Sequence, residues 1–208
     1  MTGSGMTGSA PIEVTLPGFA DPVGQAQASF RAVLDAMARP GTLVRVGDEL
    51  VAPAPLDPAT GAVLLTLVDH DTLLWLDMAR FAARDTGAAR DWIAFHCGAG
   101  FADGPAAADF ALALALPDLA TLSPGTHEQP ETAATLILQV GSLTEGARYR
   151  LRGPGLRTSS TLAVSGLPVE FVEVWQRNRG GFPLGVDVLL CAGTTLAALP
   201  RSVTVEAD

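Results

Sequence analysis

Helix-like and strand-like segments alternate along the first half of this 208-residue chain, and that order constrains the fold more than any single motif. A capped amphipathic segment at residues 19–41 is followed by a short alternating segment at 42–46. A second apolar helix is predicted near residues 58–68, and a buried strand at 72–77. Such alternation is typical of folds in which helices form layers against a sheet, so we expect the α/β class.

The segment at residues 19–41 has clear start and stop signals. Asp21 is placed to cap the first free amides, Pro22 suits the first helical position, and Pro40 with Gly41 closes the far end. Its apolar residues recur at spacings of three and four and so form one stripe: Val23, Ala26, Phe30, Val33, Leu34 and Met37. We expect the Phe30, Val33, Leu34 and Met37 part of this stripe to cover the sheet or a dimer partner.

The rest of the chain predicts further elements without an internal linker. They are a polar helix at 79–90, strands at 91–97 and 109–116, a loop at 117–130, a hairpin pairing 134–140 with 148–151, a helix at 167–179 and a closing hairpin of 186–191 with 196–199. We expect residues 12–208 to form a single domain. Residues 1–11, rich in Gly, Ser and Thr, are expected to be a disordered tail.

Composition narrows the classes of function. A formal net charge of −9 argues against general binding of nucleic acids or anionic membranes, which would repel an acidic protein. The apolar runs fall far short of the roughly 20 residues that a membrane-spanning helix needs. Cys97 and Cys191 lie far apart and form no CxxC motif, which favours a reducing, cytoplasmic compartment. We expect both cysteines to be small residues of the core.

All 13 basic residues are arginine, and the chain contains no lysine. A Schiff base to pyridoxal phosphate, a P-loop lysine and a lysine general base each require an ε-amine. Those three kinds of chemistry are therefore excluded within this chain.

Histidines and glycines offer weak candidate sites. His70 lies between Asp69 and Asp71, where it is either a proton shuttle or metal ligand, or part of a solvated turn. His96 and Cys97 are predicted on a strand, where neighbours point to opposite faces, so a shared ion is disfavoured. The glycines at 98 and 100 only faintly resemble a dinucleotide-binding loop.

Arg148, Arg150 and Arg152 occupy alternate positions of a predicted strand and so share one of its faces, with Arg157 close behind. Three guanidinium groups on one face could hold a phosphonate, a triphosphate or an acidic patch of a partner. The alternative is an ordinary solvated face that protects a sheet edge. His70 and this arginine row are the residues that we select as possible anion or partner contacts.

The chain resembles the PhnH family, the H subunit of the bacterial carbon-phosphorus lyase system. The segments that carry the resemblance appear in the expected order and span most of the chain: AQASFRAVLDAMARPG, AVLLTLVDHDTLLWL, FHCGA, ATLILQVGSL, RLRGPGL, FPLGVDVLL and ALPRS. The resemblance implies a three-layer αβα sandwich with a mixed sheet, similar to a reduced relative of the pyridoxal-phosphate-dependent transferases. It also implies that no cofactor is used, in keeping with the missing lysine.

The resemblance further implies a function within a complex. The expected partners are the G, I and J subunits and an ABC-type ATP-binding subunit, and the isolated protein is expected to form a homodimer. The complex transfers an alkylphosphonate to the ribose C1′ of ATP and releases adenine, and no catalytic residue carries over to this chain. The alternative is a stand-alone nucleotide- or phosphonate-binding enzyme with an Arg-lined pocket, using Arg150 and His70.

Overall fold

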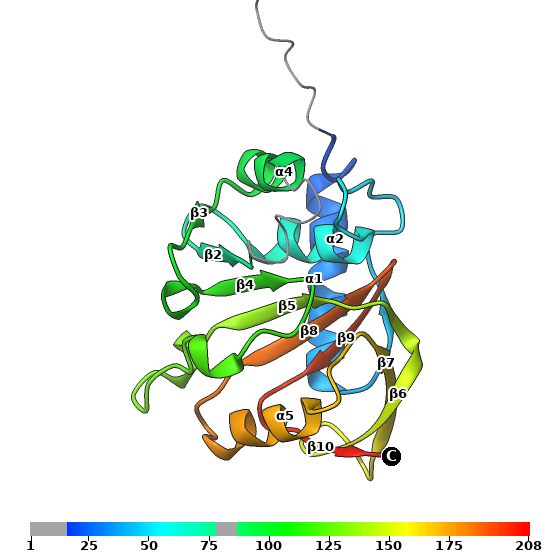
Figure 1. Ribbon diagram of the computed structural model, residues 1–208. Helices are drawn as coiled ribbons and strands as arrows, with labels where there is room; N and C mark the ends of the chain where they lie inside the picture. Colours follow the sequence, from blue (N-terminus) through cyan, green and yellow to red (C-terminus); the bar gives the residue numbers. More distant parts are fainter. Residues whose placement is uncertain (1–15, 78–86) are drawn as a thin grey trace, which may run out of the picture.

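The computed structural model describes residues 16–77 and 87–208 (Figure 1). The predicted tail at 1–11 and most of the predicted polar helix at 79–90 lie outside these residues. The helices are α1 (Pro22–Ala38), α2 (Pro58–Leu67), α4 (Gly87–Cys97) and α5 (Phe171–Gly180). The strands are β1 (Val44–Arg45), β2 (Leu73–Leu76), β3 (Gly100–Phe101), β4 (Phe110–Ala113), β5 (Thr135–Gln139), β6 (Ser142–Arg152), β7 (Ser160–Ser165), β8 (Asp187–Ala192), β9 (Thr195–Leu199) and β10 (Thr204–Ala207).

The main sheet has seven strands in the order β1-β9-β8-β5-β4-β2-β3. Strands β8, β5, β4, β2 and β3 run parallel, whereas β9 is antiparallel to β8 and β1 is antiparallel to β9. A second, antiparallel sheet has three strands in the order β10-β6-β7. The predicted α/β class and mixed sheet are therefore confirmed.

Alternating side chains of the central strands separate two cores. On β5, Ile137 packs with the cluster that includes residues of α1, α2 and α4, whereas Leu136 and Leu138 pack with α5 and the small sheet. The three helices thus cover one face of the main sheet, and α5 with the small sheet covers the other. The third layer, expected to be helical, is only partly so, because α5 shares it with β6, β7 and β10.

The predicted cap of α1 holds, but the buried face of α1 is turned from the predicted one. The Asp21 carboxylate accepts a hydrogen bond from the Gly24 amide at 3.1 Å. Val33 is buried and Met37 packs against the core, as predicted. Phe30 and Leu34 are 47% and 51% exposed, so they do not cover the sheet, and the alternative that they cover a dimer partner stays a prediction. Small residues, Ser29 and Ala36, complete the buried face instead.

Two further predictions were wrong in element type or pairing. Residues 91–97 belong to helix α4, where Ala89, Trp92, Ile93 and Cys97 form a buried helical stripe. Strand β5 does not form a hairpin with residues 148–151, because it pairs in parallel with β4 and β8. Residues 148–151 belong to β6, whose partners are β7 and β10, whereas the predicted closing hairpin of β8 and β9 is confirmed.

Within residues 16–77 and 87–208, no helix combines the length and the apolar character required to cross a membrane.

Candidate functional site

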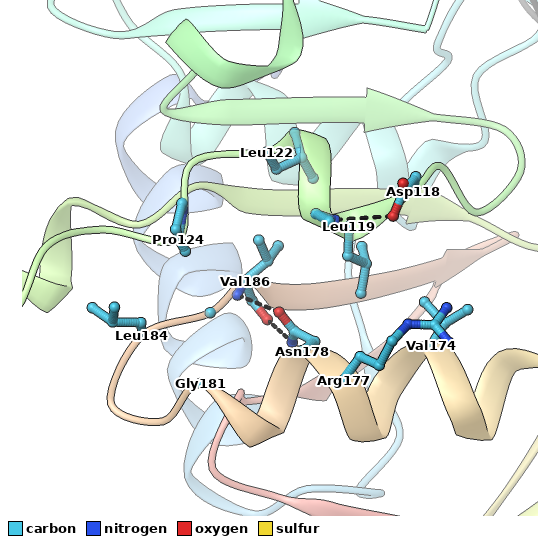
Figure 2. Close-up of a pocket in the computed structure, with 12 residues that line it drawn as sticks. Asp118, Leu119, Leu122, Pro124, Val174, Arg177, Asn178, Gly181, Leu184 and Val186 are labelled. Carbon is cyan, nitrogen blue, oxygen red and sulfur yellow. Dashed lines mark hydrogen bonds between the residues drawn. The ribbon is translucent and has the colours of Figure 1, made fainter.

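A cavity of about 340 Å³ lies between α5 and the segment at residues 118–124 (Figure 2). This volume falls in the range of small-ligand sites. Its walls are mainly apolar, formed by Leu119, Leu122, Val174, Leu184 and Val186 among others. The cavity therefore offers an apolar body of small-molecule or side-chain size a place to bind.

Hydrogen bonds fix one wall of this cavity to α5. The Asn178 side chain donates to the Val186 carbonyl and accepts from the Val186 amide, each at 2.8 Å. The Gly185 amide donates to the Pro124 carbonyl at 3.0 Å, which joins the two walls. Gly185 has a φ of +130°, and a Cβ there would lie 2.9 Å from the Asn178 carbonyl oxygen, so the close approach requires glycine.

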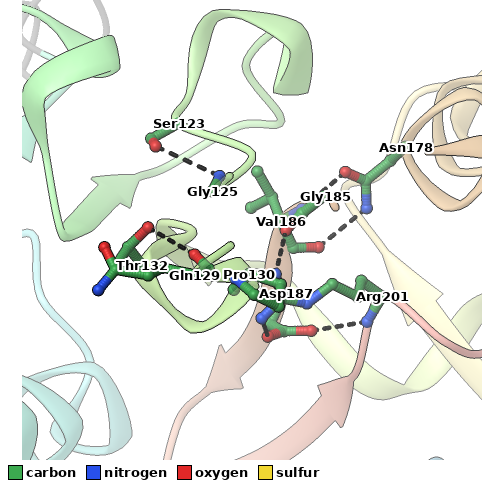
Figure 3. Close-up of polar contacts among 10 residues, drawn as sticks. All are labelled: Ser123, Gly125, Gln129, Pro130, Thr132, Asn178, Gly185, Val186, Asp187 and Arg201. Carbon is green, nitrogen blue, oxygen red and sulfur yellow. Dashed lines mark hydrogen bonds and ion pairs between the residues drawn. The ribbon is translucent and has the colours of Figure 1, made fainter. Parts of the chain in front are cut away.

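A half-buried arginine, Arg201, stabilises the same wall (Figure 3). The Arg201 guanidinium donates to the carbonyls of Pro130 and Gly185, each at 2.8 Å, and lies 3.0 Å from the Asp187 carboxylate. The Asp187 carboxylate also accepts from the Arg201 amide at 2.7 Å. These contacts tie the segments that hold Pro130, Gly185 and Asp187 to one guanidinium, which fixes the wall in place.

The charged groups at the cavity suit binding rather than catalysis. Arg177 is its cationic lining residue, and within the described part of the chain its guanidinium has no carboxylate partner. Asp118 accepts the Ala120 amide at 3.1 Å and so caps a short 3₁₀ turn. The lining contains no histidine, cysteine, serine or threonine that could pair with a base as a nucleophile. An apolar group with one polar or charged end fits these features best.

The arginine row lies elsewhere, on the outer face of the small sheet. Arg148, Arg150 and Arg152 are all exposed on β6, as the alternate spacing predicted for one face. Arg150 forms an ion pair with Asp208 and lies opposite Glu206 of β10. The row therefore forms a surface feature and does not line the cavity beside α5.

His70 lies on the loop between α2 and β2. Its side chain is 78% exposed, and its Nε2 lies 3.5 Å from the Asp71 carboxylate, which is 81% exposed. Ligand atoms of Asp69, His70 and Asp71 lie within 4.8 Å of one another, but all three residues are exposed. These observations favour a solvated turn, and the connection between α2 and β2 lies apart from β6, the strand that carries the arginine row (Figure 1).

The remaining candidates have structural partners. His96 Nε2 lies 2.9 Å from the Leu16 carbonyl oxygen, and its ring packs on Trp92. Burial raises the pKa values of the Cys97 and Cys191 thiols to about 12, which suits inert core residues. Gly98 follows helix α4 and precedes strand β3, the reverse of the strand-to-helix order in a dinucleotide-binding loop.

Sequence reasoning missed the cavity residues Asp118, Arg177 and Asn178, and the supporting Arg201. A weak signal was present at α5, where polar residues alternate with the buried Phe171 and Trp175 stripe. No spacing rule, however, joins residue 118 to residues 177 and 201, because three separate connections of the chain meet there.

Comparisons with known proteins agree with the resemblance found in the sequence. The family model described as "Bacterial phosphonate metabolism protein (PhnH)" matches residues 17–206. A protein of Rhizobium meliloti (strain 1021), named alpha-D-ribose 1-methylphosphonate 5-triphosphate synthase subunit PhnH, is 39% identical over 203 residues, covering 96% of this chain and 100% of that protein. The putative C-P lyase subunit protein HtxG of Stutzerimonas stutzeri is 31% identical over 189 residues, covering 86% and 85% of the two chains. This chain therefore belongs to the PhnH family of bacterial phosphonate metabolism proteins.

Proposed function

We propose that this chain is a non-catalytic accessory subunit of a carbon-phosphorus lyase core complex. In this role it supports the transfer of an alkylphosphonate to the ribose C1′ of ATP, with release of adenine, during the breakdown of organic phosphonates. The observation that carries the proposal is the 39% identity, over the full length of the relative, to a protein named as a subunit of ribose 1-methylphosphonate 5-triphosphate synthase.

The finer parts of the proposal follow from the family resemblance. The partners are the G, I and J subunits and an ABC-type ATP-binding subunit, and the complex works in the cytoplasm. The isolated chain forms a homodimer, with residues 12–208 as one domain related to a reduced pyridoxal-phosphate-dependent transferase. The exposed Arg148, Arg150 and Arg152 are partner contacts in this proposal, whereas His70 has no assigned role.

Reconstitution tests the accessory role against the stand-alone alternative. The isolated chain, incubated with ATP and methylphosphonate, should release no adenine, and adding the chain to the remaining subunits should restore adenine release. Adenine release by the isolated chain would support the alternative enzyme. Full activity of the other subunits without this chain would contradict the accessory role.

The cavity beside α5 has a binding part in this proposal. Val174→Trp places a large side chain in the cavity wall, whereas Val169→Trp adds the same ring at a position that is 101% exposed. We expect Val174→Trp to lower the activity of the reconstituted complex and Val169→Trp to leave it unchanged. Equal activity of both variants, with folding verified by circular dichroism, would remove the cavity from the proposal.

A further inference from the structure

Strand β7 forms one edge of the small sheet, and the register irregularity of its pairing with β6 lies near its C-terminal end, away from Thr161. Its sequence, Ser160 to Ser165, contains neither a charged residue nor proline. Natural sheets usually protect an edge of this length with lysine, proline, bulges or a covering segment. The hydrogen-bonded neighbour of β7 in the sheet is β6. On β7 itself, Thr161 is exposed and Ala163 is half-buried.

The register of the small sheet shows which backbone groups point outward from β7. The Arg148 carbonyl accepts from the Asp208 amide, so the backbone groups of Arg148 and Arg150 point towards β10. Tyr149 and Leu151 must then pair with β7, and Leu162, opposite Tyr149, points back at β6.

By the same alternation, the amides and carbonyls of Thr161 and Ala163 face away from β6. Among residues 16–77 and 87–208, no hydrogen bond reaches these four groups from beyond the edge. They are available to an added strand in the way that edge strands accept extended peptides.

The arginine row supplies charge beside this edge. Arg150 lies opposite Thr161 and Arg148 opposite Ala163, so all four side chains share the outer face. Arg150 pairs with Asp208, whereas Arg148 and Arg152 form no ion pair within the described chain. Neighbouring strands lie about 4.8 Å apart, so an added strand would lie about 10 Å from β6. The small side chains of Thr161 and Ala163 leave a path by which an arginine and a carboxylate could meet across β7.

We propose that β7 is a docking edge for an extended, acidic segment of a partner subunit. The partner's backbone pairs with Thr161 and Ala163, and its carboxylates meet Arg148 and Arg152. A second copy of this chain fits less well, because its own β7 contains no carboxylate. The inference rests on the proposed function only in assuming that partner subunits exist.

Proline substitution tests the edge without disturbing the β6–β7 pairing. Ala163→Pro removes an outward-facing amide, and proline is tolerated at such edge positions. Ala207→Pro is the matched control, because its amide faces outward from β10, the opposite edge of the same sheet. The double charge reversal Arg148→Glu/Arg152→Glu tests the row, with Arg179→Glu, exposed on α5, as its control. Melting curves of each isolated variant verify folding.

The measurement is recovery of the G, I and J subunits with a tagged chain after coexpression. We expect Ala163→Pro and the double reversal each to lower recovery at least tenfold, and both controls to match the natural chain. Hydrogen exchange should show that the amides of Thr161 and Ala163 become protected in the complex. Thr161→Pro provides a second variant if Ala163→Pro does not fold.

The outcomes separate the two proposals. If the natural chain recovers no partner, both the accessory role and the docking edge are overturned. If the natural chain and the β7 variants recover partners equally, or if the two amides exchange at the same rate free and in the complex, only the docking edge is overturned. If the isolated natural chain is a dimer and Ala163→Pro is a monomer, the edge binds a second copy, and the acidic-partner inference is wrong.

Discussion

Removing the Arg201 guanidinium should destabilise the fold by a predictable amount. In the folded chain this group makes two hydrogen bonds to carbonyls and one ion pair, and its side chain is 16% exposed against 14% for Asp187. Arg201→Met keeps most of the apolar stem and removes every polar contact of the head group. The Pro130 and Gly185 carbonyls then lose a charged donor in a setting where water reaches them poorly.

The expected loss is about 3 kcal/mol in the free energy of unfolding. Hydrogen bonds to charged groups contribute about 1.5–3 kcal/mol each, and breaking a buried ion pair from one side costs about 3–5 kcal/mol. Two features reduce the simple sum. The pair keeps some contact with solvent, and the Asp187 carboxylate retains its bond from the Arg201 amide, which the substitution leaves in place.

Urea unfolding followed by tryptophan fluorescence measures this loss. Arg157→Met is the control, because Arg157 is exposed and unpaired in the described chain. This substitution should change the free energy of unfolding by no more than about 0.5 kcal/mol. A cycle with Asp187→Asn should show coupling of at least about 1 kcal/mol between the two side chains. A loss below about 1 kcal/mol for Arg201→Met, or additive effects in the cycle, would refute the reasoning.

Four further predictions concern the cores. The thiols of Cys97 and Cys191, whose pKa values are raised from 9.0 to about 12, should resist alkylation at pH 8 until the chain unfolds. Because these thiols lose their protons at a lower pH in the unfolded chain than in the folded one, the free energy of unfolding should fall as the pH rises above about 9. Trp175→Phe removes the bond from Nε1 to the Val203 carbonyl and should cost about 2 kcal/mol in urea unfolding. Leu64→Ala, at a fully buried site, should cost about 2–5 kcal/mol in the same assay.

Local signals in the sequence predicted helix ends better than helix faces. Asp21-Pro22 marks the start of α1, and the helix predicted near residues 58–68 matches α2. The buried face of α1 was only partly predictable, because its apolar residues cover a wider arc than the contact with the sheet. Ser29 and Ala36 are buried since small residues let the helix approach closely, whereas Phe30 projects from the side.

Pairing between distant strands could not be predicted from local patterns. β5 is a continuous apolar run, which is typical of a strand buried on both faces, and a turn follows it directly. The turn suggested a hairpin, but β5 already has two parallel neighbours in the main sheet, so β6 leaves that sheet and pairs with β7 and β10. The alternate spacing of Arg148, Arg150 and Arg152 nevertheless predicted their common face.

Arg201 connects the cavity to the small sheet, and this placement separates the two proposed binding features. Arg201 lies between β9 and β10, and its guanidinium holds the Gly185 carbonyl in the cavity wall. Loosening this contact by Arg201→Met should therefore disturb the cavity and the adjoining β10.

β7 lies on the far side of β6 from β10, so its outward backbone groups should keep their positions. A folded Arg201→Met variant should consequently lose activity in the reconstituted complex while still recovering partners. Loss of partner recovery in that variant would place the docking surface near β10 instead.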